Sequence, residues 1–259
     1  MNVPAGWLAP NSRIAGVGAV MSSRAGGTSG APFDSMNVGS AVGDAAAAVA
    51  ANRRRLAEVI GAAPVFLRQV HGARVVSVGA GDSVAGAPLH EADGCVTTEA
   101  GVACVVQAAD CLPVLLAAPG GRAVGAAHAG WRGLAGGVVE VAVAAVSAAA
   151  QCAPDEICAW LGACIGPTRF EVGSDVVAAF ATDPAATAGD TSRRFVPRGD
   201  GKWLADLPGL ARDRLAAAGV RRVGGGHWCT VSDSSRFFSF RRDGVTGRMA
   251  AAIWITRPI

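Results

Sequence analysis

The stretch AADCLPVLLAAPGGRAVGAAHAGWRG, residues 108–133, is an apolar run that also carries an acid, a thiol and an imidazole. Asp110 and Cys111 stand together before a Leu-Pro-Val-Leu-Leu segment. His128 comes at the end of a second apolar segment, just before Gly-Trp-Arg-Gly. Short apolar runs bounded by turn residues are typical of buried strands. The stretch therefore predicts two buried strands joined by a turn, with polar groups at their ends.

The same pattern of apolar runs and turn residues predicts the other elements of the chain. Strands are expected near 65–70, 73–78, 102–107, 112–118, 122–128, 157–163, 236–240 and 249–256. Helices are expected near 44–60, 133–150, 171–181 and 207–218, with starts at Asp44 and Asp206 and stops at Gly61 and Gly219. The strands near 102–107, 112–118 and 122–128 follow one another through short turns, so neighbours in this trio are expected to pair antiparallel.

These elements favour an α+β fold. Helices separate some strands while other strands follow directly, which predicts a mixed sheet covered on both sides. No linker, repeat or charge run divides the chain, so we expect a single domain over residues 1–259. The segment 181–202 is rich in turn residues and predicts a long surface excursion. With 51% hydrophobic residues, the chain can bury a large core.

Composition and charge argue against several classes of function. The net charge is +3, and the basic clusters at 53–55 and 241–242 are short and not interleaved with aromatic residues, so no nucleic-acid partner is expected. Gly136, Gly137 and Glu140 interrupt the longest weakly polar stretch, which predicts a buried helix and no membrane span. The N-terminal residues lack the features of a signal peptide. Seven cysteines without a CxxC pair favour a reducing, cytoplasmic location.

Histidines are scarce, which draws attention to their positions. The four are His71, His90, His128 and His227. His71 and His128 each follow an apolar run and precede a turn, and Cys111 opens a strand. Two imidazoles and one thiolate suit zinc or copper, and three protein ligands leave a coordination position open, as in catalytic zinc sites. The separations of 40 residues (71 to 111) and 17 residues (111 to 128) match no zinc finger, so core histidines and an inert thiol remain alternatives.

The same residues also permit a cysteine hydrolase. Cys111 would be the nucleophile and His128 the base, oriented by an acid such as Asp93 or Asp110. The sequence contains no G-x-S-x-G, no G-x-G-x-x-G and no G-x-x-x-x-G-K-[ST], which argues against a serine hydrolase, a common dinucleotide site and a P-loop.

Arginines near glycines form a third group. Arg24 lies in a glycine-rich loop, Arg132 stands at the predicted start of a helix, and Arg241, Arg242 and Arg248 come late in the chain. Each is either a loop arginine tied to a carbonyl or carboxylate, or part of a clamp for phosphate or another oxyanion.

Taken together and in order, the motifs resemble a known family. They are SRAGGTSGAPFDSMNVG, AANR, RQVHGARV, ADGCVT, QAADCLPV, GAAHAGWRG, IGPTRFEV and FFSFRRDGVTGR. The chain is similar, from about residue 20 to 255, to the laccase-domain proteins, a family also called multicopper polyphenol oxidase or peptidoglycan editing factor. Its members are now associated with zinc-dependent purine nucleoside phosphorylase activity.

The resemblance implies a fold, a site and an activity. The fold is a layered α/β/β/α domain with mixed sheets. The metal ligands fall on His71, Cys111 and His128, with one zinc per chain and copper as a substitute. The implied reactions are phosphorolysis of adenosine, inosine, guanosine and S-methyl-5′-thioadenosine, together with adenosine deamination. The expected partners are therefore nucleosides and phosphate. The best substrate contacts in the matching motifs are Arg24, Asn37 and Gln69, and Arg241 is a further candidate.

The chain departs from the family pattern at Phe240, where many members carry Tyr, so a hydroxyl contact there is absent. His90, in the loop 79–91, is not assigned to the site. A true multicopper oxidase needs many more histidines, usually in H-x-H pairs, and this chain has four and no such pair. Copper in a single site could still give weak, laccase-like phenol oxidation. A metallo- or cysteine amidase acting on muropeptide precursors is the other alternative.

Two further expectations concern neighbouring residues. Asp110 is expected either to orient a metal ligand or to contact substrate. The cysteines outside the site are expected to be small core residues, with Cys229 the weakest case; they are Cys95, Cys104, Cys152, Cys158, Cys164 and Cys229. The residues leave the oligomeric state open between a monomer and a weak dimer.

Overall fold

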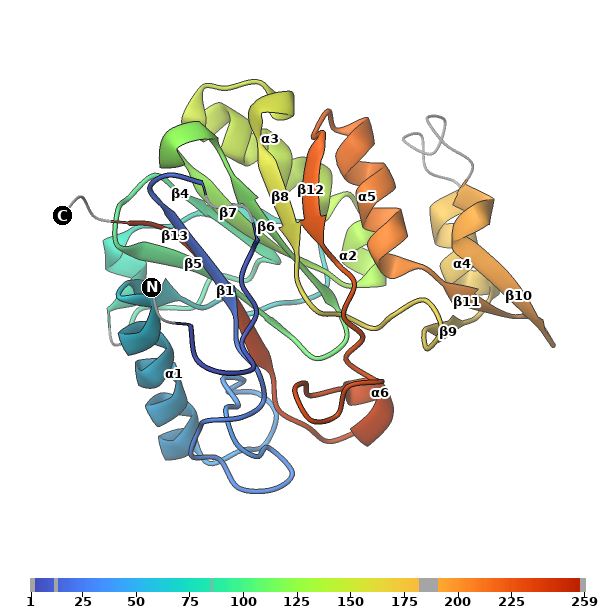
Figure 1. The fold of residues 1–259 in the computed structure, drawn as a ribbon, viewed down its shortest axis with the longest axis horizontal. Coiled ribbons are helices and arrows are strands. Elements are labelled where there is room, and N and C mark those ends of the chain that lie inside the picture. Colours follow the sequence, from blue (N-terminus) through green and yellow to red (C-terminus); the bar gives the residue numbers. More distant parts are fainter. Residues whose placement is uncertain (1–2, 12–13, 85, 182–190, 257–259) are drawn as a thin grey trace.

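Two mixed β-sheets form the centre of the protein in the computed structural model, which describes residues 3–11, 14–84, 86–181 and 191–256 (Figure 1). The six-stranded sheet has the order β12 (Arg222–Gly225), β8 (Cys158–Leu161), β6 (Leu112–Ala117), β7 (Val124–Ala129), β4 (Gly94–Thr97) and β3 (Val75–Ser77). The four-stranded sheet has the order β1 (Val17–Met21), β13 (Met249–Ile255), β5 (Val102–Ala108) and β2 (Ala63–Val65).

Helices cover the outer faces of the two sheets. The helices are α1 (Ala46–Ile60), α2 (Trp131–Ala135), α3 (Val138–Ala150), α4 (Ser174–Ala181), α5 (Leu207–Ala217) and α6 (Phe240–Asp243). Helix α1 packs on the four-stranded sheet, and α3 and α5 pack on the six-stranded sheet, so the order of layers is α/β/β/α. Each sheet contains parallel and antiparallel pairs. The expected α+β class with mixed sheets is confirmed.

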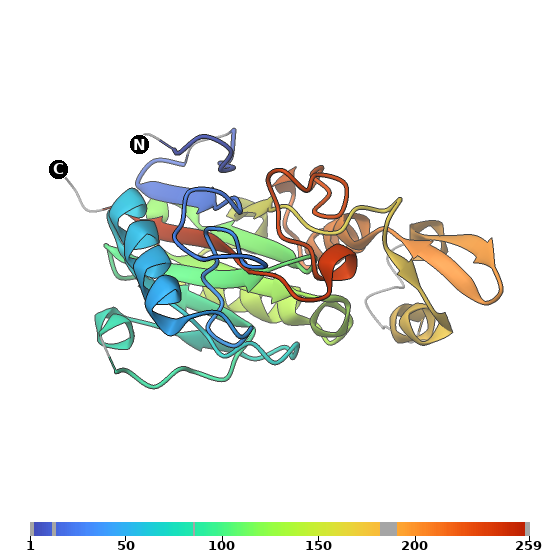
Figure 2. The same ribbon diagram turned by 90° about the horizontal axis from the view of Figure 1, so that it is seen from below.

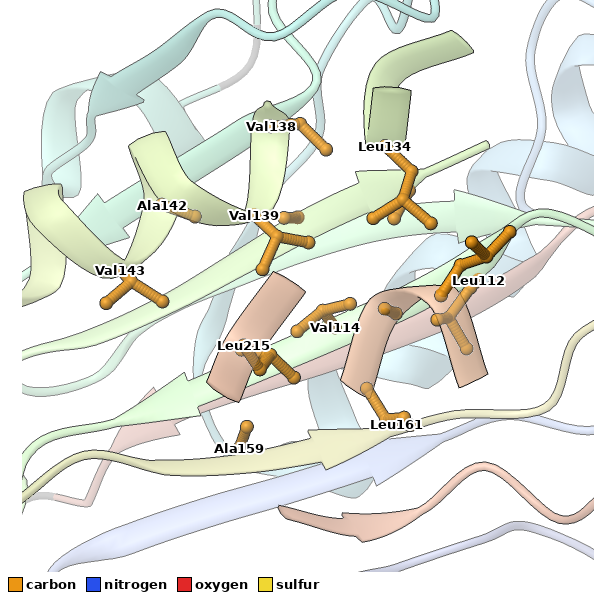
Figure 3. Close-up of a cluster of buried hydrophobic side chains, with 14 of the residues drawn as sticks. Leu112, Val114, Leu134, Val138, Val139, Ala142, Val143, Ala159, Leu161 and Leu215 are labelled. Atoms are coloured by element: carbon orange, nitrogen blue, oxygen red, sulfur yellow. The ribbon is translucent and has the colours of Figure 1, made fainter. Parts of the chain in front are cut away.

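Strand β6 shows why the apolar run of the sequence lies at the centre. All six of its residues are buried, because the strand is covered by helices on one face and by the other sheet on the opposite face. Leu112 and Val114 point into the helix-side core with Leu215 of α5 (Figure 3). Leu115 belongs to the core between the sheets. Successive strand residues alternate between faces, so one apolar segment supplies both cores.

The pairing of the central trio is partly as expected. β6 and β7 pair antiparallel, with Pro113 opposite His128, which confirms the hairpin. The expected pairing of 102–107 with 112–118 is wrong, because β5 lies in the four-stranded sheet between β13 and β2. The chain crosses from one sheet to the other at residues 109–111, and Asp110 takes a φ of 104° there. A short connection can therefore change sheets as well as reverse a strand.

Several element boundaries also differ from the expectation. The segment 236–240 contains no strand; Ser239 caps α6 through its hydroxyl. The helix expected over 133–150 is two helices, α2 and α3, because the chain breaks at Gly136 and Gly137, which has a φ of 88°. The strand expected near 65–70 is wrong beyond its first residue, because β2 ends at Val65 and only an isolated bridge at Arg68 follows. The helix expected over 171–181 begins at Ser174, after the short strand β9 (Glu171–Val172).

The predicted helix caps can be judged one by one. The Asp206 carboxylate accepts the Gly209 N–H and caps α5, as expected. Asp44 is not a cap: Ala45 holds that position, and Asp44 accepts bonds from Ser29 and Asn37. The predicted stops at Gly61 and Gly219 are confirmed; both take positive φ, which glycine adopts without strain.

The excursion expected over 181–202 falls partly on residues 182–190, which lie outside the described ranges. Beyond them, β10 (Phe195–Gly199) and β11 (Lys202–Ala205) form a hairpin that extends from one end of the molecule, with β9 beside it (Figure 2). In the part of the chain that the structure describes, no helix is both long and apolar enough to cross a membrane.

Candidate metal centre

Three predicted ligands meet where the strands of the central hairpin end. His128 is the penultimate residue of β7, Cys111 directly precedes β6, and His71 lies in the loop between β2 and β3. Their ligand atoms, imidazole nitrogens and the Cys111 Sγ, all lie within 4.8 Å of one another. The antiparallel register brings Cys111 beside His128, because Leu112 pairs with Ala129. His71 reaches the same point from a loop 40 residues earlier in the chain.

The His128 ring is oriented by a buried carboxylate. Asp93 is fully buried, and its Oδ1 lies 2.9 Å from His128 Nδ1. A carboxylate accepts hydrogen bonds, so Nδ1 carries a proton, and Nε2 is the nitrogen that can bind a metal once its own proton is displaced. A metal-binding histidine usually donates its other ring N–H to a carboxylate or carbonyl in this way. Of the two acids considered as the orienting group, Asp93 is the one that bonds His128.

The same carboxylate shapes the loop that carries His71. It accepts three consecutive backbone N–H groups, from Val70 (3.1 Å), His71 (2.9 Å) and Gly72 (2.7 Å). These bonds hold His71 in the left-handed region, with a φ of 62°. That conformation is uncommon for a residue with a side chain, and such residues cluster at functional sites. Asp93 therefore fixes two of the three candidate ligands at once.

Gly130 makes room for the site. A Cβ at this position would lie 2.8 Å from Cys111 Sγ and 3.1 Å from His71 Cδ2. The residue has an ordinary extended conformation, with φ −65° and ψ 162°, so space and not backbone freedom requires glycine here. The two imidazole rings meet edge to face, with centroids 4.9 Å apart. Gly130 was not predicted as a site residue; its place in the HAGWRG motif was the available signal.

The electrostatics of the site favour a thiolate. Burial raises the pKa of the Cys111 thiol, but the charges and hydrogen bonds of His128 and His71 outweigh burial and lower this pKa to about 6. Burial lowers the pKa of His128, but the Cys111 thiolate and Asp93 raise it to about 9. Burial likewise raises the pKa of Asp93, yet bonds from His128 and Gly72 bring it below its ordinary value. The cysteine is thus held in the form that binds metals.

This set of donors fits a transition metal. One thiolate and two neutral imidazoles are ligands that zinc and copper both accept. His71 is exposed and Cys111 is half-buried, so the site opens to solvent on the side of these two residues. Three protein ligands leave a coordination position for water or substrate, as in catalytic zinc sites. In the described ranges this is the one His, Cys, Asp or Glu group close enough to hold an ion.

Two residues expected to contact substrate make protein contacts in the structure. Asn37 is fully buried, and its amide bonds Gly39, Asp44 and the Arg248 N–H. Gln69 binds the backbone of Gln107 in both directions, at 2.9 Å and 2.7 Å, and joins the His71 loop to the end of β5. These contacts position the segments around the site, and a direct substrate contact by either residue stays a prediction.

The expected arginines are also engaged by the protein. Arg24 donates through Nε, Nη1 and Nη2 to Asp34 and the Ser234 carbonyl. Arg241 is exposed, donates to the Glu171 carbonyl, and lies over the Phe170 ring at 5.4 Å. Substrate binding by these two arginines stays a prediction as well.

Asp110 has a role that the sequence did not suggest. Its carboxylate accepts the Thr230 hydroxyl (2.5 Å) and the Arg241 N–H (2.6 Å). It therefore ties the crossover before Cys111 to the C-terminal segment, and no bond to a candidate ligand is among these contacts. Thr230 and the start of α6 are thereby held beside the residue that precedes Cys111.

The other histidines and cysteines lie outside the group of three candidate ligands. His90 pairs with Asp82, and His227 stacks on Trp228, so neither joins the three ligands. Cys95, Cys104 and Cys164 are buried as expected. The expectation is wrong for three cysteines that are only partly buried; they are Cys152, Cys158 and Cys229.

Comparison with known proteins places this arrangement in a family. The pattern of the multi-copper polyphenol oxidoreductase laccase family matches residues 18–256. The chain belongs to this family.

Similar proteins in the family carry a different functional name. The chain is 44% identical over 251 residues to purine nucleoside phosphorylase PA4543 of Pseudomonas aeruginosa, covering 96% of this chain and 98% of that protein. It is 45% identical over 243 residues to purine nucleoside phosphorylase YfiH of Escherichia coli, covering 93% of this chain and 94% of that protein.

Solved structures in the family share the fold. The crystal structure of Neisseria meningitidis protein NMB0706 has a TM-score of 0.89 at 42% identity, covering 97% of this chain and all of that one. The structure of YlmD from Geobacillus stearothermophilus has a TM-score of 0.90 at 35% identity, covering 99% and 98%.

Proposed function

We propose that this protein is a zinc-dependent purine nucleoside phosphorylase. It would cleave adenosine, inosine, guanosine and S-methyl-5′-thioadenosine with phosphate, giving the free base and the ribose 1-phosphate or its methylthio analogue. Adenosine deamination would be a second activity of the same site. The observation that carries the proposal is an open His–Cys–His site in a chain 44–45% identical to proteins named purine nucleoside phosphorylase over 93–96% of its length.

The proposed site residues divide by task. His71, Cys111 and His128 would hold one zinc ion, which would supply a Lewis acid able to polarise a substrate oxygen. Asp93 keeps the proton on His128 Nδ1 and fixes the backbone of the His71 loop. The activation barrier of phosphorolysis depends on how phosphate is oriented and on how charge is stabilised, because the ribosyl centre becomes cationic while phosphate approaches it. Binding both reactants in a fixed orientation is a large part of such catalysis.

The surroundings of the site suit a nucleoside. Val70, Phe240 and Val245 are exposed apolar side chains, at 48%, 58% and 59%. Val70 adjoins His71, and Phe240 and Val245 lie in the segment that Asp110 ties to the metal centre. Apolar walls with a few polar groups are typical of small-molecule sites. We infer that such side chains contact the base and that Arg24, Asn37, Gln69 and Arg241 contact substrate directly or hold the segments that do.

Copper-dependent phenol oxidation is the less favoured alternative. The family's name refers to several coppers, yet the described residues contain one group that could hold a metal, and all four histidines lie within them. Copper could replace zinc in that group, because copper binds such ligands more tightly.

An amidase acting on muropeptide precursors is the other alternative. It would use the same three residues, and its product, a free amino acid, distinguishes it from a phosphorylase.

The decisive assay follows the fate of the sugar. Protein of measured zinc content is incubated with inosine or adenosine, with and without inorganic phosphate, and the products are separated. The proposal predicts equal amounts of free base and ribose 1-phosphate, formed only when phosphate is present. Failure to form ribose 1-phosphate from any of the proposed nucleosides would refute it. Release of a free amino acid from a muramyl peptide would favour the amidase instead.

We also propose that the protein works in the cytoplasm, in keeping with its unpaired cysteines.

A further inference from the structure

Arg248 is held at the edge of the metal centre by the fold itself. It directly precedes β13, whose first residue, Met249, pairs with Ala108 at the end of β5. Two residues after Ala108 the chain reaches Asp110 and then Cys111. The Arg248 N–H donates to Asn37 Oδ1 at 2.8 Å, and Asn37 is fully buried. The start of the Arg248 side chain is therefore fixed by a strand register and by a buried amide.

The Arg248 guanidinium still has donors to offer. Nη1 donates to the carbonyls of Thr246 (2.9 Å) and Gly247 (3.1 Å), both in its own turn. In the described parts of the chain, Nε and Nη2 have no hydrogen-bond partner among the contacts of this residue. Arg24 and Arg242 differ, because all three of their guanidinium nitrogens donate to protein oxygens. Arg248 therefore keeps an open hydrogen-bonding edge.

The charges near Arg248 belong to the metal centre. Burial lowers the pKa of the Arg248 guanidinium, and the negative charges of Cys111 and Asp110 oppose this effect. The pairing of Met249 with Ala108 is the geometric counterpart, because it places Arg248 beside the segment that leads to Asp110 and Cys111. The Asp110 carboxylate is already occupied by Thr230 and the Arg241 N–H, and it forms no ion pair with Arg248. A half-buried cation without a paired carboxylate is costly unless an anion joins it.

The Phe240 ring is another neighbour of the Arg248 guanidinium. Its centroid is 5.8 Å from the Arg248 guanidinium carbon, and the ring itself is 58% exposed. The apolar ring offers no acceptor for the unpaired donors. The two unpaired donors are therefore available to an anionic ligand.

We propose that Arg248 binds the inorganic phosphate substrate beside the metal centre, with Asn37 as the residue that positions it. The inference rests on the proposed phosphorolysis. A guanidinium edge with two free donors matches two oxygens of a phosphate ion. Binding there places the nucleophile next to the three candidate metal ligands, where the nucleoside would be held. Arg248, not Arg24, then supplies the oxyanion contact.

The test uses full-length protein of measured zinc content. In Arg248→Gln the KM for phosphate is expected to rise about 10- to 100-fold, the factor lost with one charge-assisted contact, while the KM for inosine stays within about twofold. Arg248→Lys keeps the charge without the planar edge and should show a smaller rise in the same constant. Arg55→Ala, on the exposed side of α1, removes one positive charge elsewhere and should leave both constants unchanged.

A second measurement separates this inference from the proposed function. Calorimetric titration of inorganic phosphate into the wild-type and Arg248→Gln proteins reports binding without turnover. Weaker phosphate binding in the variant supports the inference even if the wild type releases no base, a result that would refute only the phosphorylase proposal. Unchanged phosphate affinity and an unchanged phosphate KM in a folded, zinc-containing Arg248→Gln protein would overturn the inference. If Arg248→Gln does not fold, the same comparison on Arg248→Lys decides it.

Discussion

Replacing Asp93 with Asn tests how the metal centre is built. The carboxylate accepts four hydrogen bonds, three from backbone N–H groups at residues 70–72 and one from His128. An Asn side chain has nearly the same shape but offers one acceptor oxygen and one NH₂ donor. Whichever way the amide turns, two of the four donors face an NH₂ group and lose their acceptor.

The size of the effect follows from this count. A buried donor without an acceptor costs about 1–3 kcal/mol. The free energy of unfolding therefore falls by about 2–6 kcal/mol if the NH₂ group faces Val70 and Gly72, and by about 1–3 kcal/mol if it faces His71 and His128, since the neutral His128 ring can then accept. If the NH₂ group faces His128, the ring accepts at Nδ1 and carries its proton on Nε2, where it no longer binds a metal. Loss of such a supporting carboxylate typically weakens metal binding about 10- to 100-fold.

Two assays measure these quantities. Zinc affinity is determined by competition with a chelator, and the free energy of unfolding of the metal-free protein is determined by denaturant titration. Asp82→Asn is the matched control, because it removes an Asp–His pair of 2.7 Å that lies apart from the three ligands. If Asp93→Asn binds zinc within about twofold of the wild type and unfolds at the same denaturant concentration, the role assigned to Asp93 is wrong.

Three further predictions concern other parts of the structure. Gly130→Ala should lower zinc affinity at least about tenfold, because its Cβ would lie 2.8 Å from Cys111 Sγ; unchanged affinity in a chelator titration would show that the site can shift to admit it. Removing zinc with a chelator should expose Cys111 to an alkylating reagent, and peptide mass spectrometry should find Cys111 modified far faster in metal-free protein; equal rates would argue against it as a ligand. Burial raises the pKa of Asp213, but its bonds to Arg194 at 2.7 Å outweigh burial and lower it below its ordinary value. A depressed carboxyl pKa stabilises the fold above the unfolded-state pKa, and this stabilisation is lost as pH falls through the folded-state pKa. Asp213→Asn should therefore destabilise the protein by about 1 kcal/mol at pH 7 and by progressively less as the pH falls below about 3.9, the ordinary Asp pKa, as thermal unfolding across pH would show.

The elements that could be predicted from sequence are those with a local signal. The β6–β7 hairpin and helices α1, α3 and α5 follow from apolar periodicity and turn residues, and Asp206 is a cap that can be recognised from sequence. Strands β1, β4 and β12 are short, rich in glycine or small residues, and were not predicted. Their position in a sheet comes from long-range pairing, which no local pattern reports.

The crossover at Asp110 shows a second limit of sequence reasoning. Two apolar strands separated by a few residues normally form a hairpin, yet β5 and β6 belong to different sheets. The sheet that each strand joins depends on the partners available to it, and β5 pairs with β13, which lies near the other end of the chain. Only the complete fold fixes that choice.

The candidate site divides in the same way. The sequence shows that His71, Cys111 and His128 have side chains able to bind a metal, and the structure brings them together. The ordered motifs of the family favour a metal site over buried core histidines and an inert thiol. Whether an arginine or amide faces a ligand depends on its other contacts, which are tertiary. Asn37 and Arg24 lie in motifs that suggest substrate binding, yet the structure gives their polar atoms protein partners.

Metal analysis of protein purified without added metal tests the central claim most directly. We expect one zinc per wild-type chain and a loss of most bound zinc in Cys111→Ser, with the variant still folded by circular dichroism. Several coppers per wild-type chain, or full zinc content in Cys111→Ser, would contradict it.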